Sequence, residues 1–314
     1  MPEAEYTWLP RADILRFEEI ERLVDAFLDL GVDKVRLTGG EPLLRKDLPH
    51  LVSALSARSR IKDLALTTNG VLLESQAEAL KAAGLHRLTV SLDSLRHERF
   101  RAISRFDELD QVFRGIAAAT RVFGSLKIDT VVMRGTNDDE LVDLLNFGRT
   151  WNAEIRFIEY MDVGGATHWS MDRVVSRADM LATIGAQLGH PVALGHTGSA
   201  PASRYQLPDG RTFGIIASTT EPFCADCDRS RLTADGMWYQ CLYATTGVDL
   251  RAPLRTGASA DDLRTQIRSS WASRRDRGAE QRLAARDRAA LIPLDSLRRD
   301  PGDWPTRIGS GCEG

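Results

Sequence analysis

An alternation of amphipathic helical stretches with short apolar strands runs from Phe17 to Tyr160 and limits the folds open to this chain. Apolar residues that recur every three to four positions predict helices, and short runs rich in Val, Ile and Leu predict strands. The predicted helices are 17–30, 48–57, 74–83, 109–122 and 138–151, and the predicted strands are 34–38, 64–68, 87–92, 127–132 and 154–159. This rhythm is typical of α/β proteins in which helices wrap a parallel sheet, as a barrel or as an open sheet.

The predicted strands place charged and apolar residues on opposite faces. In the first strand Lys34, Arg36 and Thr38 alternate with Val35 and Leu37, and successive side chains point to opposite faces of a strand. The later strands repeat this split, with polar or charged residues at positions 67, 69, 87, 89, 91, 93, 127, 129 and 156. Because an ordinary closed barrel packs Val, Ile and Leu inside, a polar inner face predicts a wider barrel with a solvated or ligand-filled interior.

Positive charge is expected to gather on that inner face, through Lys34, Arg36, Lys127 and Arg156. Unpaired buried cations are costly, so a phosphate-rich anionic ligand is the simplest compensation. The alternatives are a set of structural ion pairs with the carboxylates Glu41, Asp93, Asp129 and Glu159, or a position of these cations on exposed sheet edges. The chain as a whole has 41 basic and 44 acidic residues, a formal charge of −3, so its composition indicates neither nucleic acid nor membrane binding.

A glycine pair follows the first predicted strand, in the run Thr-Gly-Gly-Glu-Pro-Leu from Thr38 to Leu43. Glycine lets the backbone come close to a ligand, and the carboxyl ends of parallel strands are where binding sites form. A tight turn without a ligand is the simpler alternative for this pattern.

Three of the four cysteines form a cluster, at Cys224, Cys227 and Cys241. Three thiolates are one short of a closed zinc site, whereas a 4Fe-4S cluster held by three keeps one iron open to substrate. Structural zinc, with Cys312 or a distant carboxylate as the fourth ligand, is the alternative, and spacing alone does not decide. So few cysteines, no apolar run of about 18 to 20 residues and no secretory start predict a cytoplasmic protein.

Five ordered motifs carry a family resemblance: KVRLTGGEPL at 34–43, LTTNG at 66–70, VSLD at 90–93, EIRFIEYMDVG at 154–164 and FCADCDRSRL at 223–232. Together they resemble the GTP 3′,8-cyclase family of radical S-adenosylmethionine enzymes, which acts in molybdenum cofactor biosynthesis. The resemblance implies an incomplete parallel (β/α) barrel over 1–163 and an irregular α+β domain over 164–314.

The family's reaction converts GTP to (8S)-3′,8-cyclo-7,8-dihydroguanosine 5′-triphosphate. One 4Fe-4S cluster reduces S-adenosylmethionine to a radical that takes hydrogen from C3′ of the ribose, and the sugar radical then attacks C8 of guanine. The resemblance also implies that the product passes to a cyclic pyranopterin monophosphate synthase. The enzyme itself is expected to be a monomer or a homodimer.

The motifs assign roles to particular residues of this chain by resemblance. Cys224, Cys227 and Cys241 would hold a second 4Fe-4S cluster whose open iron meets the guanine. The residues expected to bind GTP are Arg36, Thr67, Lys127, Arg229 and Arg231, together with Lys34 and Arg156. The residues expected to line the S-adenosylmethionine site are Gly40, Ser91 and Met161.

The sequence departs from the family at both ends. The family's first cluster is held by a CxxxCxxC motif that typically precedes Met-Pro-Glu, which here occupies positions 1–3. We therefore expect the ligands of the N-terminal cluster and the first barrel strand to be missing, and S-adenosylmethionine not to be cleaved by the chain as written. A start site placed at an internal methionine would explain this. The alternative is a non-catalytic truncated paralogue that binds GTP and one iron–sulfur cluster or a structural zinc.

At the other end, the family's terminal glycine pair is replaced by Gly-Ser-Gly at 309–311, and Cys312 is expected to be a free thiol.

Overall fold

The first half of the chain follows the predicted alternation. The computed structural model describes residues 9–163, 169–195, 198–285 and 288. The strands of this half are β1 (Lys34–Leu37), β2 (Asp63–Thr68), β3 (Arg87–Ser91), β4 (Leu126–Val132) and β5 (Ala153–Glu159). Its helices are α1 (Phe17–Asp29), α2 (Leu48–Ser56), α3 (Leu73–Ala82), α4 (His97–Ser104), α5 (Leu109–Phe123) and α6 (Leu141–Thr150). Of these, only the short α4 was not predicted.

One curved sheet contains these five strands and three more from the second half. The added elements are α7 (Arg177–Leu188), β6 (Val192–Ala193), β7 (Ser203–Gln206) and β8 (Thr212–Ile216). The strand order is β1-β2-β3-β4-β5-β8-β7-β6, with β8 parallel to β5 and with β7 and β6 antiparallel. The prediction of an incomplete parallel barrel is confirmed, because the sheet is open and β1 and β6 form its edges among the described residues. The sheet also crosses position 163, so the two-domain division stays a prediction.

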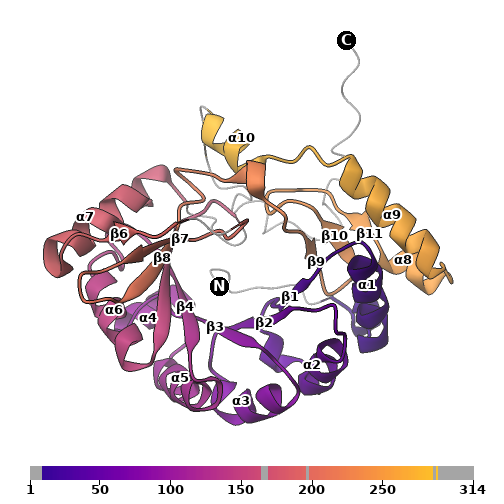
Figure 1. The fold of residues 1–314 in the computed structure, drawn as a ribbon, viewed down its shortest axis with the longest axis horizontal. Helices are drawn as coiled ribbons and strands as arrows, with labels where there is room; N and C mark the ends of the chain where they lie inside the picture. The colour runs from indigo at the N-terminus through magenta and orange to yellow at the C-terminus, as the bar shows by residue number, and fades with distance from the viewer. Residues whose placement is uncertain (1–8, 164–168, 196–197, 286–287, 289–314) are drawn as a thin grey trace.

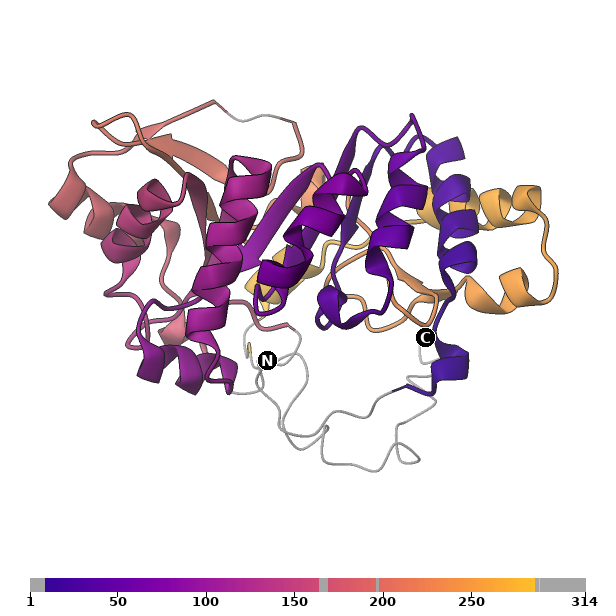
Figure 2. The ribbon, with the colours of Figure 1, turned by 90° about the horizontal axis from the view of Figure 1, so that it is seen from below.

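The helices cover the convex face of the sheet, as Figures 1 and 2 show. The residues that point toward them are apolar and buried, for example Leu66, Val90, Ile128 and Phe157, each at 0% exposure. Burying such a side chain stabilises the fold by about 1.5–3 kcal/mol. Because a slip of one residue would turn every strand side chain to the other face, this burial fixes which residues line the concave face.

A second, smaller unit packs against α1. It contains β9 (Arg231–Leu232), β10 (Met237–Tyr239), β11 (Val248–Asp249), α8 (Arg251–Arg255) and α9 (Ala260–Ala272). The helix α10 (Gly278–Ala284) follows and lies apart from them, over the open side of the curve (Figure 1). Short 3-10 turns complete the described elements: η1 (Arg11–Asp13), η2 (Pro42–Leu44), η3 (Met171–Arg173) and η4 (Cys224–Asp226). Leu23 of α1, Trp238 of β10 and Ile267 of α9 share a separate apolar core. This unit lies at the β1 end of the sheet, and the chain from β8 to β9 spans the open side of the curve (Figure 1).

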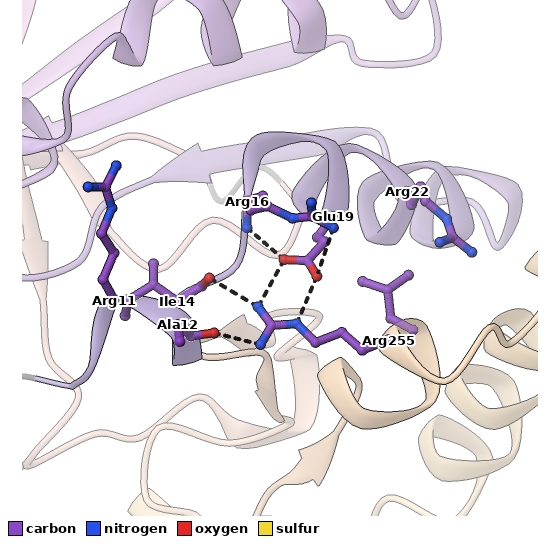
Figure 3. Close-up of a pocket in the computed structure, with 8 residues that line it drawn as sticks. Arg11, Ala12, Ile14, Arg16, Glu19, Arg22 and Arg255 are labelled. Carbon is purple, nitrogen blue, oxygen red and sulfur yellow. Dashed lines mark hydrogen bonds and ion pairs between the residues drawn. The ribbon is translucent and has the colours of Figure 1, made fainter.

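An ion pair fixes the contact between α1 and α8 (Figure 3). Nε of Arg255 donates to Glu19 Oε1 at 2.8 Å, and Nη1 donates to the carbonyl oxygen of Ala12 at 2.7 Å. The hydrogen bond from Arg255 lowers the pKa of Glu19 to about 2. The second unit is therefore held to the sheet by charge as well as by apolar packing.

Several expectations concern residues outside those described, namely the start at positions 1–3, the Gly-Ser-Gly tail and Cys312. Over the described ranges, no helix has both the length and the apolar character needed to span a membrane.

Candidate active site

The concave face of the sheet carries the cations that the strand alternation predicted. Arg36 of β1 donates from Nη1 to Thr67 Oγ1 on β2 at 2.7 Å and to Thr89 Oγ1 on β3 at 3.3 Å. Arg36 is exposed at the surface of the inner face, and partial desolvation by the neighbouring strands lowers its pKa. Lys34 projects from the same face of the edge strand and is exposed. Two hydroxyl groups thus orient Arg36. Because they are neutral, they do not compensate its positive charge.

Lys127 and Arg156 meet at a carboxylate on the same face. Lys127 Nζ lies 3.9 Å from Glu154 Oε1, and Arg156 Nε lies 3.0 Å from the same oxygen. Burial lowers the pKa of Lys127 to about 8, and the charge of Arg156 adds to this effect while Glu154 opposes it. Lys127 is therefore held in surroundings that disfavour its charge, which an added anion would relieve.

Three of the four carboxylates expected as alternative partners of these cations accept hydrogen bonds from backbone amides instead, namely Glu41, Asp93 and Glu159. Glu41 accepts from the backbone amide of Asn69 at 2.8 Å and from Thr68 Oγ1 at 2.7 Å. Glu159 is fully buried and accepts from the amides of Thr219 and Thr220 at 3.0 and 2.7 Å. Structural ion pairs do form on the inner face, but their carboxylates are Glu154 and Asp63, the latter paired with Arg87. Neither carboxylate was predicted from the sequence.

Asp129 lies between the cations without a contact of its own. In the parallel ladder it is level with Ser91 of β3 and Arg156 of β5. Its Oδ1 atom is buried without a hydrogen-bond partner. Burial raises the pKa of Asp129, and the surrounding charges of Arg156, Arg36 and Lys127 oppose that rise. Asp129 is therefore buried on this face in surroundings that disfavour its charge, while its cationic neighbours favour it.

The three residues predicted to bind S-adenosylmethionine lie at or just beyond the carboxyl ends of alternate strands. Gly40 follows β1, Ser91 ends β3 and Met161 follows β5. Gly40 has open space where a side chain would stand, and Met161 Sδ accepts from Ser218 Oγ at 3.1 Å. The loop after β1 is tied to the end of β2 through Glu41. All three residues therefore belong to the same edge of the sheet.

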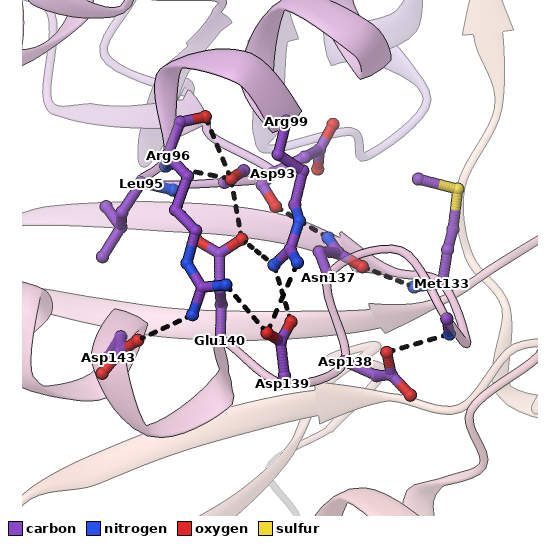
Figure 4. A network of polar contacts seen from close by, with 12 residues as sticks. Asp93, Leu95, Arg96, Arg99, Met133, Asn137, Asp138, Asp139, Glu140 and Asp143 are labelled. Carbon is purple, nitrogen blue, oxygen red and sulfur yellow. Dashed lines mark hydrogen bonds and ion pairs between the residues drawn. The ribbon is translucent and has the colours of Figure 1, made fainter.

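The loops after β3 and β4 are joined by a polar network beside Ser91 (Figure 4). Asp93 accepts from the amide of Val131 at 2.8 Å, and Asn137 Nδ2 donates to the carbonyl oxygen of Asp93 at 2.7 Å. Burial raises the pKa of Asp93 to about 6. Glu140 accepts from Ser94 Oγ and from Arg99. These contacts hold the edge that carries Ser91 in place.

The three clustered cysteines lie at one end of the β9–β10 hairpin and are free thiols. Arg231 of β9 pairs with Tyr239 of β10, so Cys227 before β9 and Cys241 after β10 are at the same end. Arg231 interacts electrostatically with both of these cysteines. A side chain at Gly278 of α10 would come within 3.1 Å of Cys241 Sγ, and α10 also packs on η4, which begins at Cys224.

Arginines surround these thiols. Nη2 of Arg229 lies 3.6 Å from Cys227 Sγ, and Nη1 of Arg274 donates to the carbonyl oxygen of Cys227 at 2.8 Å. Burial alone would raise the pKa of Cys227, but the amide and guanidinium of Arg229, with Arg274, lower it overall. Arg229 Nε is itself buried without a partner. The donor set fits a thiolate-ligated metal group, although within the described ranges no three His, Cys, Asp or Glu side chains are already arranged to hold an ion.

Comparison with known proteins agrees with this arrangement. Residues 4–148 match the Radical SAM superfamily, and residues 153–280 match Molybdenum Cofactor Synthesis C. A protein named GTP 3′,8-cyclase 1 from Mycobacterium tuberculosis (strain H37Rv) is 58% identical over 306 residues, which are 96% of this chain and 85% of that relative. The chain belongs to the GTP 3′,8-cyclase family. Membership implies S-adenosylmethionine and an iron–sulfur cluster as cofactors.

More distant similarities extend the comparison. A GTP 3′,8-cyclase of Xanthomonas axonopodis pv. citri is 47% identical, covering 89% of this chain and 84% of that protein. The crystal structure of Streptococcus suis SuiB bound to S-adenosylmethionine has a TM-score of 0.54 and 18% identity, covering 81% of this chain and 61% of that one. At this identity the SuiB structure supports the fold of the cyclase chain only.

Three charged residues on the inner face of this cyclase-family chain, Asp63, Glu154 and Arg204, were not predicted from the sequence. Asp63 is level with Lys34 and pairs with Arg87, and the predicted strand began one residue after it. Glu154 lies two positions before Arg156, so the alternation that selected Arg156 also places Glu154 on its face. Arg204 Nη2 lies 3.1 Å from Glu154 Oε2, although β7 is far along the chain. Only the pairing of β7 with β8 brings Arg204 to this site, and the local sequence carries no signal of that pairing.

Proposed function

We propose that this protein is a GTP 3′,8-cyclase, which forms the bond between C3′ of the ribose and C8 of guanine in GTP. The product would be (8S)-3′,8-cyclo-7,8-dihydroguanosine 5′-triphosphate, and its expected user is a cyclic pyranopterin monophosphate synthase. The observation that carries the proposal is the shared concave face of Arg36, Lys127 and Arg156, three cations whose surroundings favour an added anion. The 58% identity to a named cyclase supports the same conclusion.

The triphosphate is assigned to the cations of the sheet. Arg36, Lys127 and Arg156, with Lys34 at the edge, would bind phosphate oxygens through charge-assisted hydrogen bonds. Thr67 orients Arg36 through the 2.7 Å hydrogen bond between them. The guanine is assigned to Arg229 and Arg231, which lie beside the cysteines. The guanine would then provide the buried Nε atom of Arg229 with a hydrogen-bond acceptor, which it lacks in the protein alone.

The cofactors are assigned to two further groups of residues. Cys224, Cys227 and Cys241 would hold a 4Fe-4S cluster, and Arg229 and Arg274 favour the thiolate form that ligation of Cys227 requires. Gly40, Ser91 and Met161 would line the S-adenosylmethionine site. When bound, the cluster on the three cysteines would supply an open iron for the guanine. The radical would come from S-adenosylmethionine at the family's first cluster, whose CxxxCxxC ligands do not occur among the 314 residues of this sequence. The cysteines must stay reduced for this role, which fits a cytoplasmic location.

Metal content tests the assignment of the cysteines. After anaerobic reconstitution we expect about four iron atoms per chain, the content of one 4Fe-4S cluster. Cys224→Ser, Cys227→Ser and Cys241→Ser should each lose that iron, whereas the matched control Cys312→Ser should keep it. Stoichiometric zinc without iron would instead favour a non-catalytic protein with a structural metal.

Nucleotide binding tests the assignment of the sheet. Equilibrium dialysis should detect GTP binding to the reconstituted protein, and Arg36→Ala should weaken it by at least about tenfold, because a charged hydrogen-bond donor is lost. The matched control is Arg114→Gln, since Arg114 pairs with Glu74 on the outer helices and both side chains are about half exposed. An unchanged dissociation constant for Arg36→Ala would remove Arg36 from the site.

The oligomeric state needs a separate measurement. Gel filtration with light scattering would decide between monomer and homodimer.

A further inference from the structure

Arg204 is a cation on the inner face to which the preceding proposal gives no role. It lies on β7, level with Gly214 of β8, and Gly214 is level with Arg156 of β5. Side chains that are level in neighbouring strands project from the same face, so Arg204 and Arg156 stand on either side of a glycine. Their guanidinium groups converge on one carboxylate, because Arg204 Nη2 and Arg156 Nε lie 3.1 and 3.0 Å from oxygens of Glu154.

Gly214 provides the space for this convergence. A Cβ atom at position 214 would lie 3.1 Å from Cβ of Ala202 and 3.4 Å from Cγ of Arg156. The first distance is tighter than an ordinary van der Waals contact and the second is at its lower limit, and a longer side chain would occupy the gap between the two arginines. The absence of a side chain at this position therefore lets cations from β5 and β7 share one site.

The shared site has more positive than negative charge. Lys127, Arg156 and Arg204 all lie within 4.0 Å of the single carboxylate of Glu154. Glu154 is ionised, since these cations outweigh burial and lower its pKa. Even with Asp129, which is level with Arg156, counted as a second full negative charge, three cations face two carboxylates. The excess of at least one positive charge favours an anionic ligand such as a polyphosphate.

Arg204 is the member of this group that a ligand can reach most easily. Its side chain is 46% exposed, compared with 14% for Arg156 and 17% for Glu154. An ion pair with a solvent-exposed partner is weakened by water. Turning the Arg204 guanidinium from Glu154 toward a phosphate is therefore a small cost, and Arg156 and Lys127 would still hold the carboxylate.

We propose that Arg204 binds the polyphosphate tail of the nucleotide, with Glu154 positioning Lys127, Arg156 and Arg204 around it. This inference rests on the proposed function, in which GTP binds to the concave face of the sheet. It adds β7, a strand from the second half of the chain, to the phosphate site. Arg204 would then favour the binding of ligands with several phosphate groups.

The test compares two ligands and three variants. GTP and inorganic tripolyphosphate are titrated into the wild-type protein, Arg204→Gln and the outer-surface control Arg114→Gln. We expect Arg204→Gln to weaken both ligands by about tenfold and Arg114→Gln to change neither. Arg204→Lys keeps the charge but loses the planar pair of donors, so its affinities should fall between those of the wild type and Arg204→Gln. Circular dichroism and melting temperatures check that each variant is folded.

The possible outcomes separate this inference from the function on which it rests. Equal affinities in Arg204→Gln and Arg114→Gln, with GTP bound by both, would overturn the role of Arg204 and leave the proposed function standing. Tripolyphosphate binding that depends on Arg204, with no GTP binding by the wild type, would overturn the proposed function and support the anion site. If Arg204→Gln does not fold, wild-type affinity in Arg204→Lys would overturn the requirement for a guanidinium.

Discussion

Asp162 accepts a hydrogen bond from the hydroxyl of Tyr243, with 3.1 Å between the two oxygens. Asp162 lies just beyond β5 and is 1% exposed, and Arg288 also binds its carboxylate, at 3.0 Å. Burial and the nearby carboxylate raise the pKa of Tyr243, so its hydroxyl stays protonated as the donor. The amide of Tyr243 in turn lies 3.5 Å from Cys241 Sγ. One buried carboxylate thus ties the end of the sheet to the cysteine segment.

We expect Tyr243→Phe to loosen Cys241 without unfolding the protein. The variant loses one buried hydrogen bond, which contributes about 1 kcal/mol, and Asp162 keeps its arginine partners. The reconstituted variant should therefore lose iron to a chelator faster than the wild type. Tyr239→Phe removes a hydroxyl from β10 that is not a partner of Asp162 and should release iron at the wild-type rate. Equal rates in both variants would contradict a positioning role for Tyr243.

The affinity for GTP should fall as the pH rises through about 8. Burial lowers the pKa of Lys127 from 10.5 to about 8, so the ammonium group loses its charge in this range. Below that pH the charge of Lys127 attracts phosphate and costs the free protein stability. The attraction is lost as the pH rises through about 8, and the cost in stability is relieved gradually between about 8 and 10.5. Lys127→Arg should remove the pH dependence, because arginine stays charged. Dissociation constants measured from about pH 7.5 to about pH 9.5 check this, and a parallel decline in both proteins would assign it to another group.

Glu154→Gln should destabilise the free protein and increase its gain in stability on binding an anion. The change removes the only carboxylate within 4.0 Å that the structure pairs with Lys127, Arg156 and Arg204 in its described part. Leaving buried cations unpaired costs about 1–3 kcal/mol. Tripolyphosphate should therefore raise the melting temperature of Glu154→Gln more than that of the wild type. Glu74→Gln, which breaks an exposed pair on the outer helices, should show the wild-type increase.

The strands of the first half could be predicted because one face of each is buried under helices. In β4 the burial alternates strictly, with Leu126, Ile128 and Val132 buried and Lys127 and Asp129 less so, and the sequence has the same period. The helix α7 was missed although its start carries a capping box, with Ser176 and Asp179 satisfying each other's backbone amides. The two-residue strands β6, β9 and β11 are too short for any period to be visible.

The inner-face cations could be predicted for the same reason, but their partners could not. The alternation of polar and apolar residues predicts which face of the sheet carries Lys127 and Arg156. It does not predict which carboxylate will contact them. Glu41 and Glu159 were plausible partners by position, yet both bind backbone amides at strand ends. The contribution of Arg204 depends on β8 pairing with β5 and on β7 returning antiparallel beside it. Such long-range pairing is a property of the folded chain and leaves no local pattern.

The contact between α1 and α8 gives a prediction that is independent of ligands. Glu19 has a side chain only 6% exposed, and Arg255 lies 2.8 Å from it. The pKa of Glu19 is lowered from 4.5 to about 2 by the hydrogen bond from Arg255. A carboxylate with a depressed folded pKa stabilises the protein above its unfolded pKa, and this contribution is lost as the pH falls toward the folded value. It is therefore fully present at neutral pH and declines from about 4.5 toward about 2.

We accordingly expect Glu19→Gln to lower the free energy of unfolding by about 1.5–3 kcal/mol at neutral pH, the range for a hydrogen bond to a charged group. The difference from the wild type should shrink as the pH falls below about 4.5. The wild-type carboxylate is then protonated and loses the negative charge that Gln lacks at every pH. Urea unfolding of the metal-free proteins at several pH values measures this. Glu74→Gln, in an exposed pair on the outer helices, should differ little from the wild type throughout. A difference for Glu19→Gln that stays constant down to about pH 3 would mean that the charge of Glu19 does not stabilise the contact with α8, and that the apolar core around Trp238 holds it alone.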